Sequence, residues 1–173
     1  MKTIFAGAII AACSLTPAFA QTVHEIDAKQ QAVVEAWQQT PLSIRTALLV
    51  TAKAPMYGAY NERKTNQFRA GEPILMYMEP VGYTWKPVGD NEFQFGMSAD
   101  FTVKSPNGTI LGGQDGFFSV KLDSHARAQE LMMNVTIHLN GIKPGDYVLT
   151  FLIHDINNPN RTTSVDQAFT IVQ

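Results

Sequence analysis

Apolar and polar residues alternate with a period of two over most of the chain. The pattern is clearest between Glu92 and Lys104, where apolar side chains occupy every second position. Because successive side chains of a strand point to opposite faces, this pattern predicts a long strand with one buried side and one solvent-facing side. Shorter segments with the same pattern lie at 74–78, 118–122, 133–139 and 168–172.

In the segment from Tyr147 to Ile153, apolar residues would lie on both faces of a strand. This pattern predicts a central strand that is buried on both faces. Further short strands are expected at 48–52 and 109–111. The chain would then hold about eight strands, each bounded by Gly, Pro, Asn or Asp, as in an antiparallel β-sandwich.

Helical spacing replaces this alternation near the N-terminus. From His24 to Gln39 the apolar residues expected on one side of a helix are Ile26, Val33, Val34 and Trp37. Thr40-Pro41 ends this helix and also has the form of an N-cap and first helical position, which predicts a short second helix over 42–45. We therefore expect residues 21–46 to form a helical extension and residues 47–173 to form the sandwich.

The first twenty residues have the pattern of a secretory signal peptide. Lys2 is followed by an apolar stretch, and Ala18-Phe19-Ala20 has small residues at the two positions that signal peptidase reads. We expect cleavage of residues 1–20 and a periplasmic or secreted mature chain that begins at Gln21. Ile10-Ala11-Ala12-Cys13 also fits a lipobox, in which a lipid on Cys13 would anchor the protein to a membrane.

Composition limits the classes of partner. Cys13 is the only cysteine and leaves with the leader, so the mature chain has no thiol for a disulfide, a metal or nucleophilic catalysis. The net charge is −2 and the basic residues are scattered, which argues against nucleic acid and anionic membrane surfaces as partners. No segment has the length and apolar composition of a transmembrane helix.

The sequence contains no recognised catalytic or metal-binding motif. The histidines are too far apart in sequence to form a metal-ligand motif, and there is no Gly-x-Ser-x-Gly or Ser-x-x-Lys. His154 and Asp155 are neighbours, but adjacent strand residues point to opposite faces and cannot pair with each other. Asp155 is expected to cap the turn that follows it. We therefore expect no catalytic residue, no metal site and no cofactor.

One turn indicates a more specific fold. The segment 141–147 leads directly into the most apolar strand, and Tyr147 stands at the position of a tyrosine corner, whose hydroxyl bonds to the backbone a few residues upstream. This segment resembles an immunoglobulin-like domain entering its penultimate strand, and 68–74 is similar to the entry of an early strand in exported bacterial sandwiches. From about Leu48 onward the chain resembles an uncharacterised family of exported bacterial proteins with an immunoglobulin-like β-sandwich behind a short helical N-terminus. The resemblance implies no assigned active site.

Two segments that flank the strand at 74–78 combine aromatic and charged residues, and their Gly, Pro and Asn content is typical of loops. Aromatic and arginine side chains on loops are common in binding sites. We predict a binding site formed by Tyr57, Tyr60, Arg63, Glu79, Tyr83 and Trp85. In this site Tyr60, Glu79 and Tyr83 are expected to touch and to form a partly exposed patch. Alternatively, the rings seal the ends of the sandwich against the N-terminal helix, with Trp37 as a neighbour.

These observations predict an exported binding or structural domain of the bacterial envelope that is not an enzyme. Its partner would be another envelope protein or a small ligand. One alternative is a periplasmic hydrolase, which requires Glu79, Asp100 and Asp155 to converge in a cleft. Another is a structural envelope component that contacts a second protein through a sheet edge or a helix.

Overall fold

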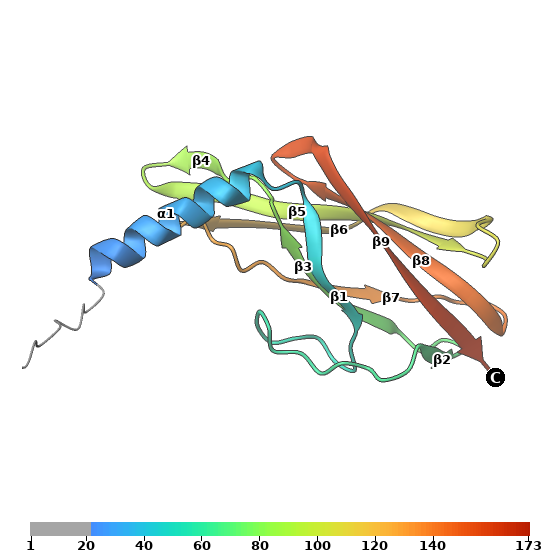
Figure 1. The fold of residues 1–173 in the computed structure, drawn as a ribbon. Coiled ribbons are helices and arrows are strands. Elements are labelled where there is room, and N and C mark those ends of the chain that lie inside the picture. Colours follow the sequence, from blue (N-terminus) through green and yellow to red (C-terminus); the bar gives the residue numbers. More distant parts are fainter. Residues whose placement is uncertain (1–21) are drawn as a thin grey trace, which may run out of the picture.

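The computed structural model describes residues 22–173, which contain one helix and nine strands (Figure 1). The expected leader, with Cys13 and the cleavage site after Ala20, lies outside these residues. The elements are α1 (Val23–Gln39), β1 (Ser43–Leu49), β2 (Gln67–Arg69), β3 (Ile74–Val81), β4 (Lys86–Gly89), β5 (Glu92–Lys104), β6 (Ile110–Ser124), β7 (Met133–Ile137), β8 (Gly145–Asp155) and β9 (Asn158–Val172).

The strands form two sheets, and the prediction of a mainly β, largely antiparallel chain is confirmed. The smaller sheet has the order β1-β3-β7. The larger has the order β2-β9-β8-β5-β4, with β6 also paired to β5. All the pairs between these strands are antiparallel except that of β2 with β9.

One core joins the two sheets. Met76, Met78 and Val135 of the smaller sheet belong to the same buried cluster as Met97 and Phe151 of the larger one. The alternating apolar positions in the sequence predict six aromatic or aliphatic residues in one core. Two of these six, Phe101 and Tyr147, are half-buried and pack against the buried cluster. The other four are buried in it: Phe95, Leu149, Phe151 and Phe169. The alternation between Glu92 and Lys104 therefore identified the inward face of β5 correctly.

The helix predicted over 24–39 is confirmed as α1, which begins with a capping box between Thr22 and Glu25. Only Val34 and Trp37 are buried on it, whereas Ile26 and Val33 are each 48% exposed. The apolar side of the helix is therefore covered only at Val34 and Trp37. No helix within residues 22–173 has both the length and the apolar composition needed to cross a membrane.

The short helix predicted over 42–45 is wrong, because these residues enter β1. Thr40 ends α1, and its N–H bonds to the carbonyls of Ala36 and Trp37. The chain then pairs with β3, with Ser43 opposite Val81. Pairing with a distant strand decides the conformation here, since Thr-Pro is compatible with either a helix start or an extended chain.

The turn before β8 has the predicted corner contact. The Tyr147 hydroxyl donates a hydrogen bond of 2.8 Å to the carbonyl of Lys143, four residues upstream. The Tyr147 ring also stacks on Phe169 of β9. The side chain therefore ties the turn to the sheet, as the sequence predicted.

Candidate functional site

Three of the predicted binding residues, Tyr57, Tyr60 and Glu79, lie in or against the smaller sheet. The chain between β1 and β2 contributes Val50 and Ala54 to a second buried cluster with Tyr77, and Tyr60 packs against this cluster. The rings of Tyr60 and Tyr77 are 4.6 Å apart. The Arg45 guanidinium donates to the Tyr57 hydroxyl at 3.3 Å, which joins β1 to the same loop.

Glu79 is buried within this region, with 6% of its surface exposed. Its carboxylate accepts hydrogen bonds from the hydroxyls of Thr46, at 2.9 Å, and Tyr77, at 2.7 Å. The Tyr77 oxygen in turn accepts from the N–H of Gly58 at 2.7 Å, and burial raises the pKa of Tyr77 to about 12. Glu79 therefore fastens the covering loop to the sheet. It belongs to β3 and not to a loop as predicted, because β3 continues through Val81 despite Pro80.

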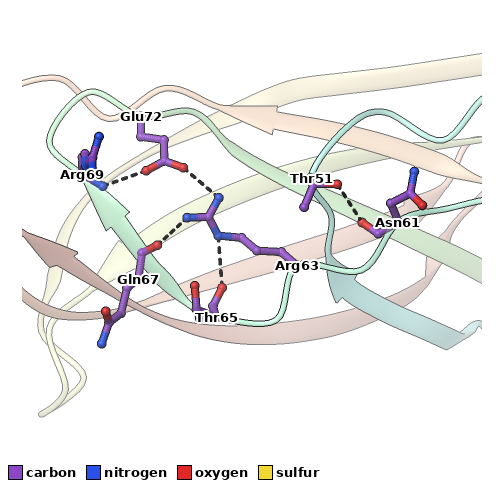
Figure 2. A network of polar contacts seen from close by, with 7 residues as sticks. All are labelled: Thr51, Asn61, Arg63, Thr65, Gln67, Arg69 and Glu72. Atoms are coloured by element: carbon purple, nitrogen blue, oxygen red, sulfur yellow. Dashed lines mark hydrogen bonds and ion pairs between the residues drawn. The ribbon is translucent and has the colours of Figure 1, made fainter.

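Arg63 makes a separate network that holds the chain between β1 and β3 (Figure 2). Its guanidinium donates to the carbonyl of Thr65 at 3.1 Å, to the carbonyl of Gln67 at 2.6 Å and to the carboxylate of Glu72 at 2.7 Å. It also lies over the Phe68 ring, 4.2 Å from the centroid. Glu72 is fixed by the backbone N–H of Arg69, which lowers the pKa of the Glu72 carboxyl. These contacts direct Arg63 inward, to other parts of this chain.

Tyr83 and Trp85 lie against the helix. The centroid of the Trp37 ring is 5.0 Å from that of Tyr83 and 5.5 Å from that of Trp85. The side chains of Tyr83 and Trp85 both donate hydrogen bonds to the carbonyl of Ala128. Tyr83 has no exposed surface, and burial raises its pKa. The prediction of a partly exposed patch that includes Tyr83 is therefore wrong. The alternative, in which these two rings pack against Trp37, matches the structure.

The three carboxylates of the hydrolase alternative have separate partners. Asp100, on the solvent side of β5, accepts from the Gly116 N–H at 2.7 Å and lies 2.8 Å from His154. The Gly116 N–H first, and His154 second, lower the pKa of Asp100. Asp155 is buried and binds Thr84, while Glu79 binds Thr46 and Tyr77.

His154 and Asp155 do point to different environments, as expected from their adjacent strand positions. His154 contacts Asp100, whereas Asp155 accepts from the N–H of Asn157 and so caps the turn into β9. Within residues 22–173, no three His, Cys, Asp or Glu side chains are grouped so that they could hold a metal ion.

Strand β6 forms an exposed edge of the larger sheet. This strand has fifteen residues and pairs on one side with β5, and the described strands include no partner for its other side. Most of its residues are exposed, and the large apolar side chains among the exposed ones are Ile110, Leu111 and Leu122. The sequence analysis found only its two ends as separate short strands, because Gly112, Gly113 and Gly116 interrupt the alternation.

Two irregularities interrupt the pairing of β6 with β5, and the larger one is a bulge that divides β6 into two parts. Ala99 is opposite Phe118 and Phe101 is opposite Gln114, so three residues of β6 face one residue of β5. Gly116, at the centre of this bulge, has a φ of 59°, which favours glycine. The part after the bulge, from Phe118 to Ser124, presents a continuous run of backbone N–H and C=O groups along the free edge.

A groove of about 440 Å³ opens beside the first part of β6. It lies between the ends of β5 and β6 and the segment that joins β7 to β8, and it is lined by Phe101, Val103, Leu111, Gly112, Gly113, His138, Leu139, Asn140, Gly141, Ile142, Lys143 and Tyr147. None of these residues was predicted as part of a site, because they come from four separate stretches of the chain.

No protein-family model matches the chain, and no curated protein matches its sequence. The evidence for function therefore comes from the sequence and from the geometry of the described residues.

Proposed function

We propose that the mature chain is an exported, non-catalytic binding domain of the bacterial envelope, and that it binds an extended segment of another envelope protein along the free edge of β6. The observation that carries this proposal is the length of that unpaired edge. In strand addition, the backbone groups of an edge strand pair with an incoming chain, and each hydrogen bond contributes about 0.5–1.5 kcal/mol net.

The part of β6 from Phe118 to Ser124 is suited to this role. Proteins usually protect sheet edges with short edge strands, proline, bulges, charged side chains such as lysine, or a covering element. This segment has seven residues in register with β5 and no proline, and Lys121 is its one lysine. The smaller edges of the larger sheet, β2 and β4, have three and four residues and offer far less backbone.

The other parts of the proposal rest on the sequence and the corner contact. The leader pattern at 1–20 supports export, and the bond from Tyr147 to the carbonyl of Lys143 supports an immunoglobulin-like arrangement of the two sheets. The intact mass of protein purified from its native host tests the processing. We expect a chain that begins at Gln21, and a lipid on Cys13 would show membrane anchoring instead.

Site-directed photocrosslinking tests the binding edge. Because the mature chain is expected to have no cysteine, a single cysteine at Ser119 can carry a photoreactive group on β6. A cysteine at Lys53, exposed in the loop between β1 and β2, is the matched control. We expect a defined adduct in intact envelopes from the Ser119→Cys protein and none from Lys53→Cys. Equal labelling from both positions would contradict the proposal.

Proline substitutions then separate edge pairing from other contacts. Along an antiparallel strand, neighbouring residues direct their N–H groups to opposite sides, so one of Ser119→Pro and Val120→Pro removes a donor from the free edge. Each proline substitution is combined with a photoreactive label at a second position on β6, Lys121→Cys. We expect the proline variant that lacks the outward donor to fold normally and to form no adduct. An adduct that persists in every folded proline variant would exclude strand addition.

A further inference from the structure

Part of the lining of the groove beside the first part of β6 is apolar and continues the main core to the surface. Five apolar residues of the groove belong to that core or pack against it: Phe101, Val103, Leu139, Ile142 and Tyr147. A sixth apolar residue, Leu111, is 55% exposed. Its volume of about 440 Å³ lies within the range of small-molecule sites. Apolar and polar surface line the groove in nearly equal measure, which suits an amphiphile.

The lining of the groove includes one cationic side chain, that of Lys143, and no aspartate or glutamate. This is a local exception, because the whole chain has fifteen acidic and thirteen basic residues. Asp146 is close in sequence, but its carboxylate accepts a hydrogen bond from the Thr170 hydroxyl of β9. The edge of the groove therefore favours an anionic group over a cationic one.

The segment that carries Lys143 is held in place before any ligand arrives. Tyr147 donates to the Lys143 carbonyl at 2.8 Å, and Gly141 makes the turn with a φ of 71°. Preformed walls reduce the ordering cost of binding.

We infer that this groove binds a single-chain amphiphile with a carboxylate head group, such as a free fatty acid. The apolar chain lies against Leu111, Leu139 and Ile142, and the carboxylate is next to Lys143. This site does not include the β6 segment Phe118–Ser124, so ligand binding in the groove and strand addition can be tested independently.

Isothermal titration calorimetry with three probes of equal chain length tests the inference. Decanoate, decan-1-ol and decyltrimethylammonium are each added to the mature protein below the concentration at which they form micelles. We expect decanoate to bind with one site per chain and about tenfold more tightly than decan-1-ol, as one charge-assisted contact would give. The cationic probe should bind most weakly. Equal affinities, or no saturable binding of decanoate, would overturn the inference.

Two substitutions locate the site. Lys143→Gln should reduce the affinity for decanoate to that for decan-1-ol and leave decan-1-ol unchanged, whereas Lys121→Gln, on the later part of β6, should alter neither. Gly112→Leu should abolish binding of both, because a Cβ at Gly112 has open space around it and the added side chain would occupy the groove.

The Gly112→Leu protein also controls for folding, since leucine replaces an exposed glycine in a strand and is expected to keep the thermal midpoint of the wild type. Decanoate binding that survives in a folded Gly112→Leu protein would place the ligand elsewhere and contradict the inference. The same conclusion follows if Lys121→Gln weakens decanoate binding as much as Lys143→Gln does.

Discussion

The indole N–H of Trp37 donates a hydrogen bond of 2.9 Å to the backbone carbonyl of Tyr83, 46 residues further along the chain. Both side chains are buried, and their rings meet edge to face. This contact fixes the end of α1 against the loop that follows β3. It also explains why Tyr83 and Trp85 lie against the helix.

Trp37→Phe is expected to destabilise the protein although it retains an aromatic ring. The Tyr83 carbonyl would lose its donor in a buried place, which costs about 1–3 kcal/mol. Chemical denaturation followed by circular dichroism measures the change in the free energy of unfolding. Val33→Ala, at a position on the same helix that is 48% exposed, is the control and should change it by less than about 0.5 kcal/mol. Similar effects from both substitutions would mean that α1 is not fixed through Trp37.

Phe151→Ala is expected to cost about 3–5 kcal/mol, because it leaves a cavity in the core between the two sheets. Phe151 has no exposed surface, whereas the next residue, Leu152, is 41% exposed on the other face of β8. Leu152→Ala should therefore cost about 1 kcal/mol or less. A denaturation midpoint that is unchanged in Phe151→Ala, or equal losses in the two variants, would show that the faces of β8 have been assigned wrongly.

Local patterns predicted those elements whose environment is uniform along their length. The strand β5 alternates without interruption because one of its faces meets the core throughout. Tyr147 was identified because its hydroxyl bonds to Lys143, only four residues away. By contrast, the first residues of β1 were predicted as a short helix, because their extended form depends on β3, with Ser43 opposite Val81.

The candidate sites were not predictable for the same reason. Tyr83 has the composition of an exposed loop residue, and its burial depends on Trp37 and Phe95 from other elements. The free edge of β6 depends on which strands pair with β5, which no local pattern records. Its glycines further hide the strand, since Gly116 is required by the bulge opposite Asp100.

Arg63→Lys is expected to destabilise the segment between β1 and β3 although the charge is kept. A lysine has no planar fork and cannot replace the bonds to Thr65, Gln67 and Glu72 together (Figure 2). We expect a loss of about 1–3 kcal/mol in the free energy of unfolding. Lys64→Ala, where the side chain is 82% exposed, should have little effect. If Arg63→Lys proves neutral, the network does not stabilise the fold.

Asp100→Asn should alter stability in a pH-dependent way. The pKa of Asp100 is below the usual value of 3.8 in the folded protein, chiefly because of the Gly116 N–H and then because of His154. The ionised carboxylate therefore adds stability above about pH 4, and this contribution is lost as the pH falls through the folded pKa. The cost of the substitution, from urea unfolding at a series of pH values, should be larger at pH 6 than at pH 2. A cost that does not vary with pH would contradict this assignment.

Tyr77→Phe should show the opposite dependence at alkaline pH. Burial raises the pKa of Tyr77 to about 12 from an ordinary value of 10, so the folded state retains a proton that the unfolded state loses between these values. The stability that Tyr77 provides is thus complete below about pH 10 and decreases as the pH rises toward 12. At neutral pH the substitution should cost about 1–3 kcal/mol, since Glu79 and the Gly58 N–H each lose a buried partner. That cost, measured by denaturant unfolding, should shrink steadily above pH 10. A constant cost up to pH 12 would mean that the hydroxyl ionises normally and that the contact with Glu79 is exposed to solvent.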